Sequence, residues 1–407
     1  MNQPVTSYQR WLSRRYIAYE LLTNLWFVGA VWLYFYRLFI TDQQVGILDS
    51  VAFAVGLIAE VPSGALADRF GRDKMVKIGQ VLAGSGFLIQ AFGSSFMPFF
   101  VGQAILMVGV SFVSGADEAL FFGRLNFDRT SVHWRRLVTR GSQIALVGTL
   151  FATVAGGWLH TFNPRLPWVL TGVAFLSSVL LIWSIKDTRP EKEKQKLSVE
   201  VREYLASIKS GFVQFCTPKL WLYVPIILTV QGLFYTAGWG LLRLVLLDRF
   251  HFDPLFGSIV IATSGLITVG ILALMHKYAE SMSEKHVLTF ISLGAAASLL
   301  LSFANIGMWG YFVILALYAG EHVLYPFMSE VLNHRAPEDQ RATVLSVASF
   351  LRTLPYVLLA PIIGYLNMHD DLEYFLVGWA LLIGVATLIY LSLKKKDSHI
   401  SMIQKEV

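Results

Sequence analysis

Long apolar runs alternate with short polar segments along almost the whole chain. A helix needs about 20 apolar residues to cross the hydrocarbon core of a bilayer. Runs of roughly this length are expected at residues 17–40, 44–67, 75–94, 97–122, 138–161, 166–186, 220–247, 254–276, 286–305, 308–332, 343–366 and 372–393. The pattern therefore predicts an all-α membrane protein with twelve transmembrane helices, numbered here as spans one to twelve.

The longest polar segment separates six spans from the other six. We expect an N-terminal bundle over residues 1–186, a cytoplasmic linker over 187–219 and a C-terminal bundle over 220–407. Within the linker, apolar residues recur at helical spacing. They are Leu197, Val201, Tyr204, Leu205, Ile208, Phe212 and Phe215. This spacing predicts an amphipathic helix that lies on the membrane surface and ends before Pro218.

Lysine and arginine are sorted by loop. Nearly all of the 33 lie before span one or after an even-numbered span, whereas the opposite loops contain only Arg165 and Arg249. Basic residues are enriched on the cytoplasmic side of membrane proteins, so both termini are expected in the cytoplasm. The net charge of +6 therefore reflects orientation in the bilayer and does not indicate a nucleic-acid partner.

Composition narrows the class of protein further. Hydrophobic residues make up 55% of the chain and charged residues 15%, compared with about 25% charged residues in soluble domains. The single cysteine, Cys216, excludes an internal disulfide and argues against a structural zinc site. The usual motifs of ATPases, zinc proteases, dithiol redox proteins and serine hydrolases are absent, so we expect no enzyme activity, cofactor or metal. Compact loops without a glycosylation sequon favour a bacterial inner membrane.

A charged stretch with two glycines separates spans two and three. It reads Gly64-Ala65-Leu66-Ala67-Asp68-Arg69-Phe70-Gly71-Arg72. Gly71 permits a tight turn with positive φ, and Asp68 lies where it can face the positive end of a neighbouring helix dipole. Arg69 and Arg72 are expected to hold this loop in the cytoplasm. Just before the loop, Pro62 is expected to interrupt span two.

This stretch resembles the signature loop of the major facilitator superfamily, G-x-L-A-D-R-x-G-R-(R/K), and departs from it at the last position, Asp73. The resemblance covers nearly the whole chain. It implies two pseudo-symmetric six-helix bundles around a central cavity lined by spans one, four, seven and ten. It also implies a transporter that works by alternating access.

The resemblance further implies a conformational gate. Its members would be Gly64, Asp68, Arg69, Gly71 and Arg72 in the loop, together with Asp49 and Glu60 in span two. Asp49 and Glu60 are eleven residues apart and share a helix face, which the resemblance places beside span eleven. Asp68 would contact the start of span eleven in the outward-facing state.

Spans four and ten contain ionisable residues that are costly in a bilayer, by ~2.5–3.5 kcal/mol each. Asp117 and Glu118 lie in span four, and Glu321 and His322 occupy the aligned positions of span ten. Carboxyl groups in the cavity could exchange a proton, and histidine titrates near physiological pH. The alternative is that some of them pair with buried arginines and only hold the bundles together. Asp117 and Glu118 cannot face the same direction.

Three arginines lie within spans. Arg37 and Arg243 are near the outer ends of spans one and seven, and Arg352 is deeper in span eleven. Arg352 could bind an anionic substrate or neutralise a buried carboxylate, and we favour neutralisation. All three belong to the expected proton-coupling or substrate cavity.

We expect proton-coupled efflux of an amphiphilic small molecule by a monomer in the lipid bilayer. Aromatic residues in the cavity-lining spans favour such a substrate. They are Trp26, Phe27, Trp32, Tyr34, Phe234, Tyr235 and Trp239. Many drug/proton antiporters of the superfamily carry an arginine motif in span four and a proline motif in span five, and this chain lacks both residues. Uptake of a metabolite or siderophore-like anion, held by one of the three arginines, is therefore an alternative. A membrane sensor or scaffold is the alternative from another class.

Overall fold

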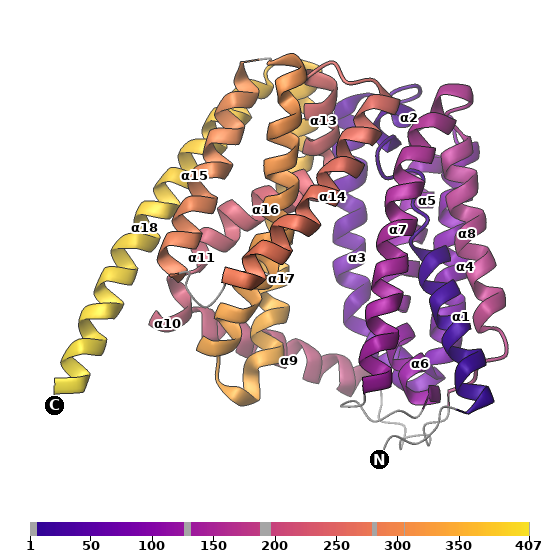
Figure 1. Cartoon of the computed structure of the whole chain (residues 1–407), viewed down its shortest axis with the longest axis horizontal. Helices are drawn as coiled ribbons and strands as arrows, with labels where there is room; N and C mark the ends of the chain where they lie inside the picture. The colour runs from indigo at the N-terminus through magenta and orange to yellow at the C-terminus, as the bar shows by residue number, and fades with distance from the viewer. Residues whose placement is uncertain (1–5, 126–131, 188–196, 279–282, 305, 407) are drawn as a thin grey trace. The chain divides into compact units, whose positions relative to one another are not determined.

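The computed structural model describes residues 6–125, 132–187, 197–278, 283–304 and 306–406. Across these residues the chain forms helices joined by short turns, with no β-strand (Figure 1). In this part of the chain, ten helices are long and apolar enough to cross a membrane. An eleventh apolar helix, Leu166–Ile182, is shorter, and the region of span one is divided between two helices. The all-α membrane fold is thus confirmed, although not every predicted span is one long helix.

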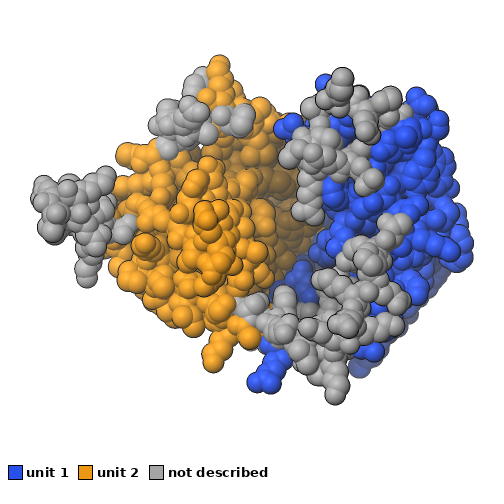
Figure 2. All heavy atoms as spheres, turned by 90° about the horizontal axis from the view of Figure 1, so that it is seen from below, with its two compact units in different colours: residues 1–40, 51–203 blue, residues 41–50, 204–407 orange. Residues whose placement is uncertain are grey.

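The chain divides into two compact units (Figure 2). Unit 1 comprises residues 1–40 and 51–203. Its helices are α1 (Ser7–Thr23), α2 (Trp32–Tyr36), the part of α3 (Asp42–Phe70) that follows residue 50, α4 (Arg72–Phe92), α5 (Phe96–Val113), α6 (Ala116–Leu125), α7 (Val132–Phe162) and α8 (Leu166–Ile182). Its core near α6 is aromatic: the ring of Tyr16 lies 5.1 Å from that of Phe121 and 6.2 Å from that of Trp134.

Unit 2 comprises residues 41–50 and 204–407. Its helices are most of α9 (Leu197–Phe215), α10 (Pro218–Trp221), α11 (Val224–Ile226), the π-helix η1 (Ile227–Gln231), α12 (Gly232–Gly238), α13 (Leu241–Arg249), α14 (Pro254–Tyr278), α15 (Glu284–Phe303), α16 (Gly310–Arg335), α17 (Arg341–Met368) and α18 (Leu372–Glu406). Two short 3₁₀ turns, η3 (Gly307–Trp309) and η4 (Glu338–Gln340), precede α16 and α17. The first nine residues of α3 also belong to this unit, because they pack on α17.

Helix α9 occupies the position where the sequence predicts an amphipathic helix. Its last turns pack on protein: Gly211 lies against Thr343 and Val347, and the ring of Phe212 is 5.8 Å from that of Phe350. The start of α17 therefore covers one side of this end of the helix.

The predicted loop between spans two and three is almost entirely helical. Helix α3 continues through Pro62 to Phe70, so the expected interruption of span two is wrong. Membrane helices tolerate such a proline because neighbouring groups can satisfy the freed backbone carbonyl. Only Gly71 turns the chain, with φ 93°, as the sequence predicts. Asp73, where the chain departs from the family motif, forms an ion pair of 3.1 Å with Lys77 one turn later in α4.

Glu284, at the start of α15, joins several helices at one end of unit 2. Its Oε1 accepts hydrogen bonds from the hydroxyls of Tyr223 (2.8 Å) and Tyr390 (3.0 Å) and from Nζ of Lys394 (2.8 Å). Its Oε2 lies 3.7 Å from Nη2 of Arg335, at the end of α16. One carboxylate thus connects the region before α11 with α15, α16 and α18.

We expect Glu284→Gln to lower the free energy of unfolding by roughly 2 kcal/mol, because an amide weakens several charge-assisted hydrogen bonds at once. The melting temperature in detergent should fall by several degrees. Glu338→Gln is the matched control, since Glu338 is exposed and, among the residues that the structure describes, its ion pair is with Arg341, three residues later. Equal melting temperatures for the two variants would contradict this stabilising role of Glu284.

Candidate functional site

Three of the predicted cavity-lining spans are discontinuous. Span one is interrupted between α1 and α2, span four between α5 and α6, and span seven between α12 and α13. In transporters, discontinuous helices expose backbone groups that bind substrates and coupling ions. The interruptions therefore locate the candidate functional sites, one set in each unit.

Gly115 causes the interruption of span four. It has φ 70°, a conformation that side-chain-bearing residues rarely adopt, and a Cβ there would meet no atom within 4 Å. The aligned position of span ten is Ala319, and α16 continues through it without interruption. The two aligned segments thus differ in backbone because only one of them has a glycine at this position.

Asp117 lies in the first turn of α6, directly after this interruption. Its Oδ1 accepts a hydrogen bond of 2.8 Å from the amide of Glu118, and its Oδ2 accepts one of 3.3 Å from the hydroxyl of Tyr19. Nε2 of Gln80 donates to the same hydroxyl over 2.7 Å. Within the described part of the chain, every hydrogen-bond donor to Asp117 is neutral. The side chain of Glu118 is exposed, whereas that of Asp117 is partly buried, so the neighbouring carboxylates have different environments.

Unit 2 contains a buried ion pair between α16 and α17. Nη1 of Arg352 donates to Oε1 of Glu321 over 2.7 Å, and the two side chains are only 12% and 6% exposed. The guanidinium lies over the rings of Tyr325 (4.1 Å) and Tyr235 (4.9 Å). Gly238, at the end of α12, packs against the aliphatic part of Glu321. Arg352 therefore pairs with a carboxylate inside its own unit, under a cover of aromatic rings.

A second buried carboxylate lies beside this pair. Asp49, from the beginning of α3, accepts a hydrogen bond from the hydroxyl of Tyr356 in α17. The same hydroxyl accepts the amide of Leu241 over 2.9 Å. This amide is the first of α13, where the interruption of span seven leaves a donor without a carbonyl of its own helix. Tyr356 thus links the interruption to Asp49.

Another cation of unit 2, the partly buried Arg243, lies near His322. The rings of His322 and Tyr318 stack with centroids 4.5 Å apart, and Nδ1 of His322 is 2.9 Å from the Tyr318 carbonyl. Arg243 is close enough to both side chains to interact with them electrostatically. Arg243 and His322 therefore share one local environment, separate from the Arg352–Glu321 pair.

The other predicted residues are dispersed. Arg37 caps the end of α2, and Glu60 and Arg69 are exposed on α3. Nη1 of Arg72 donates to the Ala119 carbonyl over 3.3 Å and its amide to Asp187 over 3.1 Å. The side chain of Asp68 and the surroundings of Gly64 lie outside the described residues. Of the two span-two carboxylates, Asp49 contacts α17, whereas Glu60 is solvent-accessible.

Four side chains that complete these sites, through a hydroxyl, an amide or a ring, were not among the predicted residues. They are Tyr19, Gln80, Tyr325 and Tyr356. A usable signal was present, because Tyr325 lies four residues after Glu321 and Tyr356 four after Arg352. Residues four apart share a helix face, so each tyrosine lies on the side of its helix that carries the charge, although Tyr325 contacts Arg352 and Tyr356 contacts Asp49. No group of metal-binding side chains occurs within the described residues.

Removing one member of the Arg352–Glu321 pair should destabilise the protein more than removing both. We expect Arg352→Gln or Glu321→Gln to cost ~3–5 kcal/mol, because each leaves an uncompensated buried charge, and the double variant to recover much of that loss. The check is thermal unfolding in detergent of the wild type and the three variants. The control is Glu373→Gln in the more exposed 3.5 Å pair with Arg249, which should cost under ~1 kcal/mol. Strictly additive losses in the double variant would contradict this coupling.

Comparison with known proteins identifies the family of this chain. The sequence profile of the Major Facilitator Superfamily matches residues 21–360. The uncharacterised MFS-type transporter YxaM of Bacillus subtilis is 22% identical over 88% of this chain and 90% of its own length. Multidrug resistance protein 2 of the same bacterium is also 22% identical, over 85% and 86%. A solved peptide transporter, POT in complex with sulfate, has the same fold, with a TM-score of 0.74 at 13% identity over 96% and 94%. The chain therefore belongs to the Major Facilitator Superfamily of membrane transporters.

Proposed function

We propose that this transporter exports an amphiphilic small molecule in exchange for protons. The observation that carries the proposal is the environment of Asp117, a partly buried carboxylate at a helix interruption whose donors are all neutral within the described residues. Such a group can gain and lose a proton without breaking an ion pair. The similarity to Multidrug resistance protein 2 supports export of this class of compound.

Glu321 and Arg352 supply a second protonation-sensitive contact. When Glu321 is ionised, Arg352 is held over Tyr325 and Tyr235. Protonation of Glu321 would weaken the pair and release the guanidinium from it. Tyr325 is 47% exposed and Trp239, at the interruption of span seven, 58% exposed. These rings offer an apolar surface to an amphiphilic substrate.

We further propose that the first turns of α3 act as a gate on α17. Gly46 lies against the Ala360 carbonyl, and Gly364 lies against the carbonyl of Asp42, with no room for a Cβ at either glycine. Small residues permit such close approach between membrane helices. The hydroxyl of Ser50 donates to the Val357 carbonyl at the same contact. Alternating access would require this contact to open and close.

Orientation and assembly complete the proposal. The sorting of basic residues supports cytoplasmic termini, and we place the protein in a bacterial inner membrane as a monomer. Uptake of an anion is the competing function. The environment of Arg243 beside Tyr318 and His322 is the observation that favours it.

Proton coupling can be tested with purified protein in liposomes that contain a pH-sensitive dye. For exchange, we expect externally added ethidium to make the lumen more alkaline as protons leave. Asp117→Asn should reduce this signal to that of empty liposomes, and the exposed Glu338→Gln should match wild type. Acidification of the lumen by an added aromatic carboxylate would instead support proton-coupled anion uptake. Ethidium accumulation without any pH change would contradict proton coupling.

The gate predicts that a larger residue at position 46 holds α3 and α17 apart. In a Cys216→Ser background, we expect Gly46→Val to increase the rate at which a membrane-impermeant maleimide labels a cysteine placed by Ser50→Cys. Gly270→Val is the control, because a Cβ at this α14 glycine meets no atom within 4 Å. An unchanged labelling rate in the folded Gly46→Val variant would contradict the proposed gate.

A further inference from the structure

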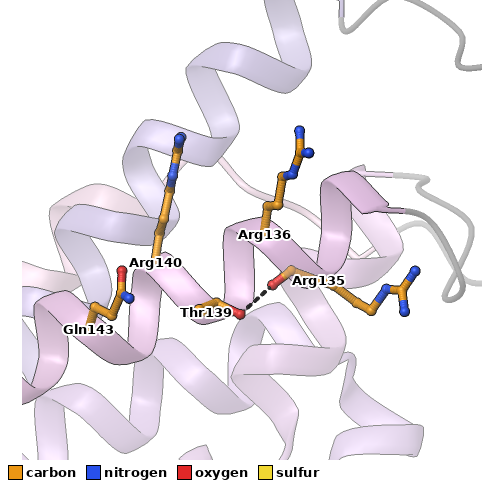
Figure 3. A pocket seen from close by; sticks show the side chains of 5 residues that line it. All are labelled: Arg135, Arg136, Thr139, Arg140 and Gln143. Carbon is orange, nitrogen blue, oxygen red and sulfur yellow. Dashed lines mark hydrogen bonds between the residues drawn. The ribbon is translucent and has the colours of Figure 1, made fainter.

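One face of α7 near its beginning is strongly basic. Arg135, Arg136 and Arg140 line a hollow there together with Thr139 and Gln143 (Figure 3). All five side chains are exposed. Their spacing of one, three and four residues places them on one side of the helix. The hollow is therefore a feature of a single helix face and belongs entirely to unit 1.

Packing of the opposite face of α7 fixes the direction in which the arginines point. Trp134 and Leu137 are buried, and the ring of Trp134 packs edge-on against that of Phe122 at 4.9 Å. One turn later, Gly141 lies against the ring of Tyr16 in α1. The helix cannot rotate without exposing this aromatic packing, so the arginines are held outward.

The three guanidinium groups have no acidic partner within the described residues. The hydroxyl of Thr139 donates to the Arg135 carbonyl over 2.9 Å, which leaves the arginine donors available. Arg136 and Arg140 lie four residues apart, a spacing at which like charges repel on a helix. An anion with several oxygens would relieve this repulsion and accept several charge-assisted hydrogen bonds.

The same face becomes apolar further along α7. Leu146, Val147 and Phe151 follow the basic residues and are 37%, 62% and 64% exposed. The face thus has a cationic end and an adjoining exposed apolar end along one helix. A free phosphate would use only the first, whereas a phospholipid would use both.

We propose that this face of α7 is a binding site for an anionic phospholipid. The phosphate contacts Arg135, Arg136 and Arg140, with the Gln143 amide as a further donor, and an acyl chain lies along Val147 and Phe151. The site is independent of the proposed transport reaction. It would couple stability or activity of the transporter to the anionic lipid content of its membrane.

Native mass spectrometry of the full-length protein in detergent tests this site, with added phosphatidylglycerol, phosphatidylcholine or glycerol 3-phosphate. Each basic residue near a lipid surface contributes about a fivefold change in affinity. We therefore expect the triple variant Arg135→Gln, Arg136→Gln, Arg140→Gln to bind phosphatidylglycerol on the order of 100-fold more weakly. The matched control removes the same charge from exposed residues elsewhere, through Arg10→Gln, Arg14→Gln and Lys209→Gln.

The proposal predicts that wild type and control prefer phosphatidylglycerol to phosphatidylcholine, and that the triple variant loses this preference. Val147→Ser with Phe151→Ser should weaken phosphatidylglycerol binding and leave glycerol 3-phosphate unaffected. If glycerol 3-phosphate binds as tightly as phosphatidylglycerol, the site takes a free phosphate and the lipid proposal is wrong. Equal losses in the triple variant and the control would also overturn it. Melting temperatures confirm folding, and Arg136→Gln alone, expected to lose about fivefold, decides the question if the triple variant unfolds.

Discussion

The Arg352–Glu321 ion pair is the contact on which the arrangement of unit 2 depends. Two opposite charges 2.7 Å apart, each nearly excluded from solvent, are stable only if neither loses its partner. The pair also determines what surrounds it. Gly238 is needed where α12 approaches the Glu321 side chain, and Tyr325 and Tyr235 cover the guanidinium with electron-rich ring faces. Two helices and the end of a third are therefore fitted around one charge pair.

Interruptions of helices impose the second constraint, because each leaves backbone groups without intrahelical partners. Unit 2 satisfies one of them with a side chain: the Tyr356 hydroxyl accepts the amide of Leu241 and donates to Asp49. A backbone requirement in α13 is thereby connected to a carboxylate of α3. In unit 1 the carboxylate of Asp117 itself accepts an amide from the first turn of α6, in which Asp117 lies. The carboxylates for which a transport role is proposed thus also accept hydrogen bonds from groups at the helix interruptions.

The sequence predicted the positions of the helices well, and it predicted poorly which side chains contact one another. Apolar run length located the long helices, and the glycine at position 71 correctly predicted a positive φ. The prediction from local propensity was wrong at Pro62, where an interruption was expected and α3 instead continues as a helix. The sequence also indicated that Asp49 and Glu60 share one face of span two; in the structure Asp49 bonds Tyr356 of α17 and is buried, whereas Glu60 is exposed. Periodicity specifies a face of a helix, whereas burial depends on how far the neighbouring helix extends, which no single stretch of sequence encodes.

The two halves carry aligned ionisable residues in unlike settings, and one small difference accounts for much of this. Gly115 permits the interruption that places Asp117 in the first turn of a new helix, where an amide and a tyrosine hydroxyl satisfy it. Ala319 does not favour that conformation, so Glu321 lies in the middle of continuous α16 and has no free amide nearby. A carboxylate in a helix interior must find its donors on other helices, and Arg352 provides them. The two aligned carboxylates therefore differ in their partners, because the backbone at the preceding residues decides whether the charge is held by neutral donors or by a cation.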